Sequence, residues 1–372
     1  MTVATESDSG AQRAEFQRRY AAAEKLAEQG NFDAALTEYD TLLRHADTLG
    51  PVLLAQIHND LGFISFLAGQ LDEARADFNR ALAVDPFCRE AHANIRKLDE
   101  LTSGSLSDDE VIDYLRGFYA NDKPAMDYIT VHLRRFTETL NFLPKAAGEM
   151  CLLELGANTL FSPLLKKFTD YDVSHGDYWG GGDRERQLNL VSTDGNEKVK
   201  MKVLNFDAEK DPFPFADAVF DVVLACEIIE HLPNDPMHTL IECNRVLKPG
   251  GRVVLTTPNI TSYRSLHGIL NGYPPYIYNK FSRNNGGRHV KEYAPREFEM
   301  LLPKAGFAVE TLDTRNVWAD AEPGTSYWNM YRGMHNILKA LGSPLNLRGE
   351  DIFVTGVKQG RPKERHPVEF YD

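Results

Sequence analysis

The spacing of apolar residues divides the chain into a helical first part and an alternating second part. Over roughly the first hundred residues, apolar positions recur every three or four residues, as in amphipathic helices. From Met150 onward, short apolar runs alternate with helical stretches, a pattern typical of a doubly wound α/β domain with a mostly parallel sheet. The runs predict strands at about 150–155, 171–176, 202–206, 219–226, 251–257, 307–313 and 352–358.

The helical part contains an internal repeat, in which residues 30–35 (Gly-Asn-Phe-Asp-Ala-Ala) match residues 69–74 (Gly-Gln-Leu-Asp-Glu-Ala). The offset of 39 residues fits a helical hairpin of about 34 residues with a short insertion. In such repeats, small residues let two helices approach closely, aromatic rings fill the groove, and a proline ends the second helix. The second copy resembles a tetratricopeptide repeat at Leu61, Gly62, Gly69, Ala74, Phe78, Ala81, Leu82 and Pro86.

Two recognisable copies are fewer than the roughly three repeats that such an array usually needs. Something must therefore cover the open face of this repeat-like domain, which we place at residues 11–101. The cover is either the helices that follow in the chain or another molecule, namely a protein partner or a second copy of this chain. The sequence leaves both alternatives open.

Polar and capping residues mark the borders between the expected domains. Residues 101–107 are rich in Ser and Thr and read as a linker, and Ser107 with Glu110 forms a capping box that starts a helix. A second helix is expected between Pro124 and Pro144. The predicted organisation is a disordered tail, a repeat-like helical domain, a helical lid or linker and an α/β domain, at residues 1–10, 11–101, 108–145 and 146–372.

The composition narrows the functional classes. A net charge of −13 and a pI near 5.4 make nucleic acid an unlikely partner, because that affinity comes mainly from Lys and Arg on phosphates. No apolar run approaches the roughly 20 residues of a membrane span, and the polar N-terminus has no signal-peptide core. Four cysteines without CxxC spacing are expected to be reduced thiols of a cytoplasmic protein: Cys88, Cys151, Cys226 and Cys243.

Residues 220–259 carry the strongest chemical signal. An apolar strand ends in Glu-Ile-Ile-Glu-His, and the helix that follows is stopped by Pro-Gly-Gly before a second apolar strand. The segment resembles the core of class I S-adenosylmethionine-dependent methyltransferases in its motifs FDVV, EHL, RVLKPGG and TPN. The resemblance extends over about half of the chain, residues 148–313 and the last strand. It implies a mostly parallel, seven-stranded Rossmann-like sheet that binds S-adenosyl-L-methionine at the carboxyl ends of its strands.

The turn after the first strand is the expected donor site. Gly156 ends an apolar strand, and a glycine is needed there because the ligand passes against bare backbone. The family usually has three glycines in this turn, whereas this chain has one. Asn158 can adopt a left-handed conformation and would then replace a second glycine. Because the other glycines are missing, a methyltransferase-like domain that has lost catalytic activity remains an alternative.

Carboxylates that follow the next two parallel strands are expected to hold the nucleoside. Asp177 lies 21 residues after Gly156, where a ribose-binding carboxylate is expected, and Asp172 is its competitor inside the strand. The resemblance implies that Asp207 accepts a hydrogen bond from the adenine amine, with a neighbouring side chain against the ring. The expected donor-binding residues are Glu154, Gly156, Ala157, Asn158, Asp177, Phe206, Asp207, Ala208, Cys226 and Glu227.

Three side chains that follow the fourth strand lie on one face if their segment is helical: Glu227, Glu230 and His231. His289 follows later, in a stretch similar to one found after the fifth strand of several O-methyltransferases. In small-RNA 2′-O-methyltransferases and ubiquinone-pathway O-methyltransferases, the corresponding positions bind a divalent metal beside the methyl donor. The resemblance therefore implies Mg²⁺ or another divalent metal at these four residues, where it would activate and orient an acceptor hydroxyl.

A site without metal is the alternative for the same cluster. His289 would then act as a general base, since its ordinary pKa lies near neutrality, or the histidines would have structural roles only. In either chemistry the candidate catalytic residues are His289, His231 and Glu227.

Two insertions in the α/β domain, residues 260–296 and 314–350, are expected to form the acceptor side. Residues 263–296 contain six Lys or Arg, one acid and several tyrosines, which suits a sugar ring with phosphate or carboxylate, or a nucleotide. The alternative is a solvated loop whose tyrosines pack on the sheet. The second insertion would form the other wall or cover a sheet edge, with Trp318, Tyr327, Trp328 and Tyr331.

The sequence thus predicts a methyltransferase dependent on S-adenosylmethionine. We expect transfer to a hydroxyl oxygen of a glycan or another polar small molecule, with or without a divalent metal. One alternative is N-methylation of a protein or peptide that the repeat-like domain recruits. Another is a scaffold whose methyltransferase domain has lost catalysis. Methylation of RNA fits the Glu/His motif but conflicts with the net charge of −13.

Overall fold

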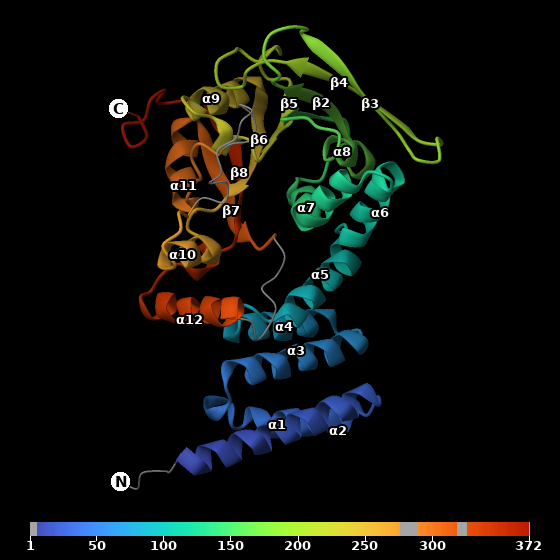
Figure 1. Ribbon diagram of the computed structural model, residues 1–372, viewed down its shortest axis with the longest axis vertical. Coiled ribbons are helices and arrows are strands. Elements are labelled where there is room, and N and C mark those ends of the chain that lie inside the picture. Colours follow the sequence, from blue (N-terminus) through green and yellow to red (C-terminus); the bar gives the residue numbers. More distant parts are fainter. Residues whose placement is uncertain (1–5, 276–288, 318–325, 372) are drawn as a thin grey trace. The chain divides into compact units, whose positions relative to one another are not determined.

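The computed structural model describes residues 6–275, 289–317 and 326–371, which fall into two compact units (Figure 1). The first unit, Met1–Ser107, is built from helices in its described part, and the second, Asp108–Asp372, is built around one sheet. In the described part of the chain, helices that combine the length and the apolar character needed to cross a membrane are absent.

The first unit consists of helices that pack in sequential pairs, α1 on α2 and α3 on α4, with α5 against α4. The Gly62 backbone approaches the Phe78 ring so closely that a Cβ on Gly62 would lie 2.7 Å from it. This contact explains the small and aromatic positions of the repeat and confirms the prediction of paired repeat helices. The helices are α1 (Glu6–Glu28), α2 (Phe32–Leu43), α3 (Pro51–Leu67), α4 (Leu71–Val84) and α5 (Arg89–Ser103), with a 3₁₀ turn at Ala46–Thr48.

Two borders of this unit differ from the prediction. Helix α1 begins at Glu6, inside the segment that was expected to be a disordered tail. Helix α5 continues to Ser103, into the expected linker, and ends where Gly104 adopts a left-handed conformation with φ of 64°. Glycine tolerates this conformation and is a common helix terminator, so the helix stops at Gly104 rather than at Leu101.

The second unit contains a mixed sheet of eight strands in the order β3-β4-β2-β1-β5-β6-β8-β7. The pairs β4–β2, β2–β1, β1–β5 and β5–β6 are parallel, and the remaining pairs are antiparallel. The doubly wound α/β class is therefore confirmed. The strands are β1 (Met150–Leu155), β2 (Tyr171–Asp177), β3 (Glu185–Val191), β4 (Lys198–Asn205), β5 (Phe220–Cys226), β6 (Leu247–Pro258), β7 (Phe307–Arg315) and β8 (Asp351–Lys358).

Strand β3 is one strand more than the seven expected. It pairs antiparallel with β4 at the edge of the sheet and buries only Leu190 fully, against Val199 and Met201 and beside α6. An edge strand with one apolar face and many polar residues gives no continuous apolar run, so the sequence pattern did not show it.

Helices cover both faces of the sheet (Figure 1). Helices α9 (Pro236–Val246) and α11 (Pro295–Lys304) pack on one face, in a core that includes Val223, Leu240 and Phe298. Helices α6 (Asp108–Tyr119), α7 (Lys123–Phe142) and α8 (Ser162–Phe168) lie on the other side. The insertions contribute the remaining helices, α10 (Tyr263–Leu270) and α12 (Ser326–Ala340), and a 3₁₀ turn at Leu345–Leu347.

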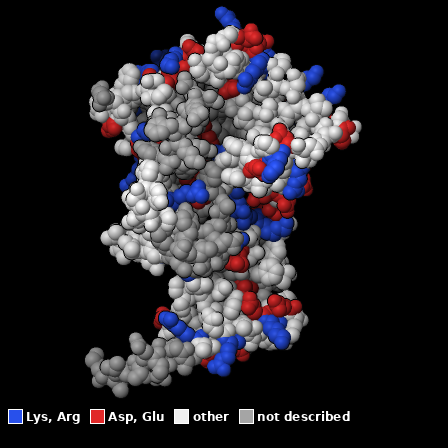
Figure 2. Space-filling view, viewed as in Figure 1, with Lys and Arg blue, Asp and Glu red and all other residues white. Residues whose placement is uncertain are grey.

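Basic and acidic side chains are interspersed on the face that Figure 2 shows. Within the second unit, oppositely charged side chains form ion pairs over short distances, such as Arg116 with Asp113 at 2.9 Å and Lys123 with Asp127 at 3.0 Å. Such exposed pairs contribute little to stability. They do show that nearby carboxylates neutralise the positive charges of Arg116 and Lys123.

Candidate active site

Two adjoining cavities lie at the carboxyl ends of the parallel strands. The larger has a volume of about 550 Å³ and is lined by α7 as well as by residues that follow β1 and β5. The smaller has a volume of about 310 Å³ and lies near the ends of β2 and β4. Both cavities are lined by Leu155, Gly156, Ile228 and His231. The two cavities are therefore neighbours that share this part of their lining.

The turn after β1 lines both cavities through Gly156. Gly156 has φ of 81°, and a Cβ there would lie 2.3 Å from Cδ1 of Ile228. The N–H groups of Gly156 and Ala157 both donate to the carbonyl oxygen of Gly176, at 2.9 and 3.0 Å. The turn thus requires glycine both for its backbone conformation and for the space that Ile228 occupies.

Asn158 does not replace a second glycine, contrary to our expectation. Among the described non-glycine residues, positive φ occurs only at Ala218 and Glu227. The Asn158 side chain instead accepts hydrogen bonds from the backbone N–H groups of Leu160 and Phe161, at 2.9 and 2.8 Å. This local side-chain cap holds the turn in a standard conformation, so additional glycines are not needed there.

Asp177, at the end of β2, lines the smaller cavity. Its Oδ2 lies 2.6 Å from a guanidinium nitrogen of Arg186 on the unexpected strand β3, and this guanidinium stacks over the Trp179 ring at 4.3 Å. Burial raises the pKa of Asp177, and the N–H of Tyr178 and the charge of Arg186 act in the opposite direction. Asp172, the competing carboxylate, is exposed inside β2 and is not among the residues that line either cavity.

The loop after β4 brings Phe206, Asp207 and Ala208 to the smaller cavity. The Asp207 carboxylate accepts hydrogen bonds from the Glu209 N–H at 3.0 Å and from the Lys210 ammonium at 3.1 Å. The Phe206 ring packs so closely on β2 that a Cβ at Gly176 would lie 2.5 Å from it. The carboxylate and the aromatic ring are therefore fixed on neighbouring positions of this wall.

Glu227 does not join the other members of the expected Glu/His cluster. Its φ of 54° places its backbone in the left-handed region, and the 3₁₀ turn Ile229–His231 begins only after it. Its carboxylate binds the Arg135 guanidinium of α7 at 2.5 Å and accepts a hydrogen bond from Thr256 at 2.9 Å. The helical spacing that would put all three side chains on one face is broken by this conformation, so the expectation is wrong for Glu227.

Arg135 and His132 bring charge and polarity from α7 into the larger cavity. Burial lowers the pKa of Arg135, but the charges of Glu227 and Asp351 and the hydrogen bond to Glu227 act together in the opposite direction, and the net pKa is raised. Burial and the nearby Arg135 charge lower the pKa of His132 to about 3, so its imidazole is neutral at physiological pH. Neither residue was expected from the sequence, although two polar residues on the buried face of an amphipathic helix are a usable signal.

Glu230, His231 and His289 come together as a cluster whose three candidate ligand atoms lie within 4.8 Å of one another. The Glu230 side chain is fully buried, and its Oε1 lies 3.9 Å from Nε2 of His231 and 4.0 Å from Nε2 of His289. Its Oε2 accepts a hydrogen bond from Thr257 at 2.8 Å, whereas Oε1 has no hydrogen-bond partner in the described structure. Burial, and then the Glu227 charge, raise the pKa of Glu230.

His289 is oriented from its other side. Its Nδ1 lies 2.8 Å from Oε1 of Glu292, which turns Nε2 toward Glu230. A carboxylate that binds one ring nitrogen commonly orients a histidine whose other nitrogen is a metal ligand or a base. His289 and Glu292 are only three residues apart, so their spacing in the sequence was a signal for this pair that the prediction did not use.

Two further expected donor residues have polar or sulfur side chains on the larger cavity. Glu154 lines the larger cavity, and its Oε2 lies 2.6 Å from Nδ1 of the buried His175 imidazole. Cys226 also lines the cavity, and burial raises the pKa of its thiol well above the ordinary value. Cys226 is therefore a protonated, weakly nucleophilic group.

The tyrosines of the insertions are only partly accounted for. Tyr293 is buried in the core of the sheet and is not an acceptor contact, because it packs on Phe298. Tyr263 bonds His335 at 2.8 Å and packs on Tyr331, which ties α10 to α12. Several expected acceptor residues lie outside the described residues or side chains: Tyr276, Tyr278, Lys280, Phe281, Arg283, Arg288, Trp318, Tyr327 and Trp328.

Comparison with known proteins finds sequence similarity in both units. Residues 163–255 match the family model of a methyltransferase domain, and residues 55–88 match that of a tetratricopeptide repeat. The chain is 30% identical over 141 residues to the 27-O-demethylrifamycin SV methyltransferase of Amycolatopsis mediterranei. The aligned stretch covers 37% of this chain and 48% of that protein. The chain is also 32% identical over 112 residues to the mitochondrial ubiquinone biosynthesis O-methyltransferase of Rattus norvegicus, which covers 30% of each.

Among solved structures, an S-adenosylmethionine-dependent methyltransferase from Archaeoglobus fulgidus aligns with a TM-score of 0.40 and 17% identity, over 64% of this chain and all (100%) of that one. The chain spans half or less of the length of the two curated relatives above (48% and 30%). The α/β unit is therefore similar to methyltransferase domains over residues 163–255, and the helical unit is similar to a tetratricopeptide repeat over residues 55–88. The family resemblance expected from the sequence is thereby confirmed.

Proposed function

We propose that this protein transfers the methyl group of S-adenosyl-L-methionine to a hydroxyl oxygen of a glycan or another polar small molecule, with help from a divalent metal. The observation that carries the proposal is the Glu230 carboxylate. It is fully buried, one oxygen lacks a hydrogen-bond partner in the described structure, and the two imidazoles of His231 and His289 face that oxygen. A carboxylate buried in such surroundings is neutralised either by a proton, as the raised pKa of Glu230 allows, or by a bound cation, and the two facing imidazoles favour the cation in this proposal.

The two cavities divide the donor between them in this proposal. The adenosine would lie in the smaller cavity, with its ribose on Asp177 and its adenine amine on Asp207. The methionine part would pass Gly156 into the larger cavity. There the ion pair of Arg135 and Glu227 offers one partner for each charge of a zwitterion, the carboxylate and the ammonium.

The cluster of three residues fits a divalent metal. One carboxylate and two imidazoles are a donor set that Mn²⁺, Zn²⁺ and related ions accept, and the ligand atoms lie close enough to share one ion. Glu292 and Thr257 orient His289 and Glu230 from outside the cluster. When bound, the metal would lower the pKa of the acceptor hydroxyl and hold its oxygen. Glu227, which the sequence placed in the ligand set, would serve the donor instead.

The metal-free alternative uses the same residues differently. The Glu292 carboxylate would then orient His289 as a general base that takes the hydroxyl proton, with its Nε2 on the acceptor side. Both versions share the donor site and differ in whether the cluster holds an ion.

Binding of Mn²⁺, followed by its electron paramagnetic resonance signal, tests the metal proposal without knowledge of the acceptor. We expect the chelator-treated wild-type protein to bind Mn²⁺, and Glu230→Gln and His289→Ala to lose binding. Glu227→Gln is the matched control, because the structure places this carboxylate outside the cluster. All variants other than Glu227→Gln should still bind S-adenosylhomocysteine. Absence of Mn²⁺ binding by the wild type, or equal loss in Glu227→Gln, would exclude the proposed ligand set.

A further inference from the structure

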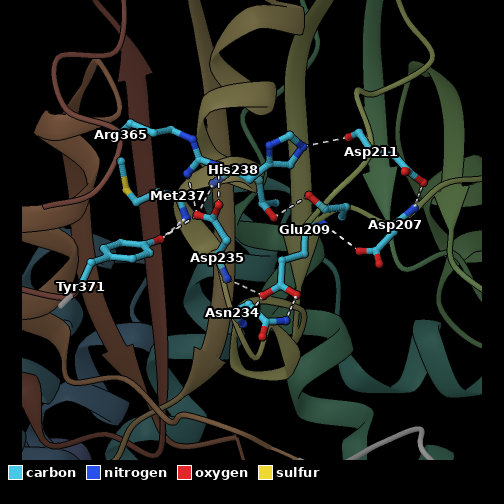
Figure 3. A network of polar contacts seen from close by, with 11 residues as sticks. Asp207, Glu209, Asp211, Asn234, Asp235, Met237, His238, Arg365 and Tyr371 are labelled. Atoms are coloured by element: carbon cyan, nitrogen blue, oxygen red, sulfur yellow. Dashed lines mark hydrogen bonds and ion pairs between the residues drawn. The ribbon is translucent and has the colours of Figure 1, made fainter.

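The segment that follows β8, residues 359–371, forms hydrogen bonds with the start of α9. The Arg365 guanidinium binds both carboxylate oxygens of Asp235, at 2.6 Å for Nη1 to Oδ1, and the Tyr371 hydroxyl donates to Oδ1 at 2.8 Å (Figure 3). Asp235 is the N-cap of α9 and also accepts a hydrogen bond from the His238 N–H at 3.1 Å. The last described residues of the chain therefore hold the first turn of this helix.

The start of α9 in turn holds the loop after β4. Glu209 is buried and accepts hydrogen bonds from the N–H of Asp235 at 2.6 Å, from the N–H of Asn234 and from the Asn234 side chain at 2.9 Å. Figure 3 shows Glu209 pointing from its loop toward these two residues. Two more bonds join the same elements, from Thr239 to the Ala208 carbonyl at 2.8 Å and between His238 and the Asp211 carbonyl at 2.9 Å.

This loop carries Asp207, the carboxylate that faces the smaller cavity. The Glu209 N–H donates to Asp207 Oδ1 at 3.0 Å, and the Asp207 N–H donates to Asp211 Oδ2 at 2.9 Å. Hydrogen bonds within residues 207–211 therefore hold the turn that contains Asp207, and Glu209 attaches this turn to Asn234 and Asp235 at the start of α9. A continuous set of hydrogen bonds leads from Arg365 through Asp235 and Glu209 to Asp207.

We infer that Arg365 and Tyr371 are positioning residues for the methyl donor, acting through Asp235 and Glu209 to hold Asp207 for the adenine. This inference rests on the proposed donor site. It gives the segment 359–371 a role in donor affinity although none of its residues lines either cavity. Preorganisation of this kind raises affinity because the loop does not have to be ordered when the ligand binds.

The charge state of Asp235 agrees with a persistent anchor. Burial raises its pKa, but hydrogen bonds from Arg365 and Tyr371 outweigh that effect, so its pKa lies below the ordinary value. Asp235 is therefore ionised at neutral pH, which favours the short, charge-assisted contacts seen with Arg365.

Arg365→Ala tests the inference in the full-length protein, with Arg365→Lys as a conservative rescue. Arg252→Ala is the matched control, since the guanidinium of Arg252 in β6 binds both carboxylate oxygens of Glu310 in β7 in a similar way. The two arginine side chains are exposed to a similar extent, 39% for Arg365 and 36% for Arg252. A general loss of a surface ion pair would therefore affect both variants alike.

Two readouts are needed. Calorimetry with S-adenosylhomocysteine should show about tenfold weaker binding for Arg365→Ala, because the loop that carries Asp207 must then be ordered when the ligand binds, with partial recovery in Arg365→Lys and no change in Arg252→Ala. Hydrogen exchange should show faster exchange of the Glu209, Asn234 and Asp235 amides in Arg365→Ala alone. Equal behaviour of Arg365→Ala and Arg252→Ala in both readouts would overturn the inference.

The exchange readout also separates this inference from the proposed function. If the wild type fails to bind S-adenosylhomocysteine, the proposed function is wrong. In that case unchanged exchange of the loop 207–211 in Arg365→Ala would overturn the anchoring role as well, whereas faster exchange would uphold the anchor and remove only its link to the donor.

Discussion

Replacement of Gly156 by alanine should damage the donor site more than its small size suggests. The residue has φ of 81°, and a Cβ would lie 2.3 Å from Cδ1 and 3.2 Å from Cγ1 of Ile228. Such distances are too short, so Ile228 must move. Because Ile228 lines both cavities, its displacement also changes the space available to the donor.

The expected cost has two parts. An alanine in the left-handed region costs roughly 1–2 kcal/mol. Moving Ile228 away from a preferred rotamer adds about 0.5–1.5 kcal/mol. Gly156→Ala should therefore lower the free energy of unfolding by about 1.5–3.5 kcal/mol in total, if these two terms add.

Gly195→Ala provides the matched control, because Gly195 has φ of 76° and its Cβ would meet nothing within 4 Å. Urea unfolding should show only the conformational part of the cost for Gly195→Ala. Calorimetry should show weakened S-adenosylhomocysteine binding for Gly156→Ala alone. The second change Ile228→Val removes Cδ1 and should restore part of both losses. Equal stability loss in the two glycine variants, with unchanged ligand affinity in Gly156→Ala, would refute the reasoning.

Three further outcomes can be measured. Asp177→Asn should weaken S-adenosylhomocysteine binding by about 1.5–3 kcal/mol, whereas Asp172→Asn should not; the opposite ranking would reassign the ribose carboxylate. Arg135→Ala should weaken the same binding about tenfold in calorimetry and leave Mn²⁺ binding unchanged; unaltered affinity would remove Arg135 from the donor site. The lowered pKa of Asp235 means that its ionised form stabilises the fold above pH about 4, and this contribution is lost as the pH falls further. The difference in melting temperature between wild type and Arg365→Ala should therefore shrink below pH about 4. A difference that stays constant with pH would contradict this role of Asp235.

The central parallel strands β1 and β5 were predictable because most of their residues are buried on both faces of the sheet. Both strands are apolar apart from Glu154 in β1 and Asp221 in β5, and the turn signals that follow them mark their carboxyl ends. The same logic placed Gly156, Asp177 and Asp207 at the edge where the cavities lie. Position at a strand end is a property of sequence order, so it needs no knowledge of tertiary contacts.

Other features depend on contacts between distant segments. Arg135 reaches Glu227 from a helix 92 residues earlier, and Arg186 reaches Asp177 from an edge strand with little apolar signal. The left-handed backbone at Glu227 is also held by its surroundings, since a non-glycine residue there is strained when isolated. For that reason the spacing of Glu227, Glu230 and His231 predicted a common face that the fold does not form.

The most direct test of the central claim is a calorimetric titration of the full-length wild-type protein with S-adenosylhomocysteine. The account predicts saturable binding of one ligand per chain, and markedly weaker binding by Asp207→Ala. Absence of binding at millimolar ligand concentration, by a protein that is folded by circular dichroism, would contradict the assignment of the two cavities as a methyl-donor site.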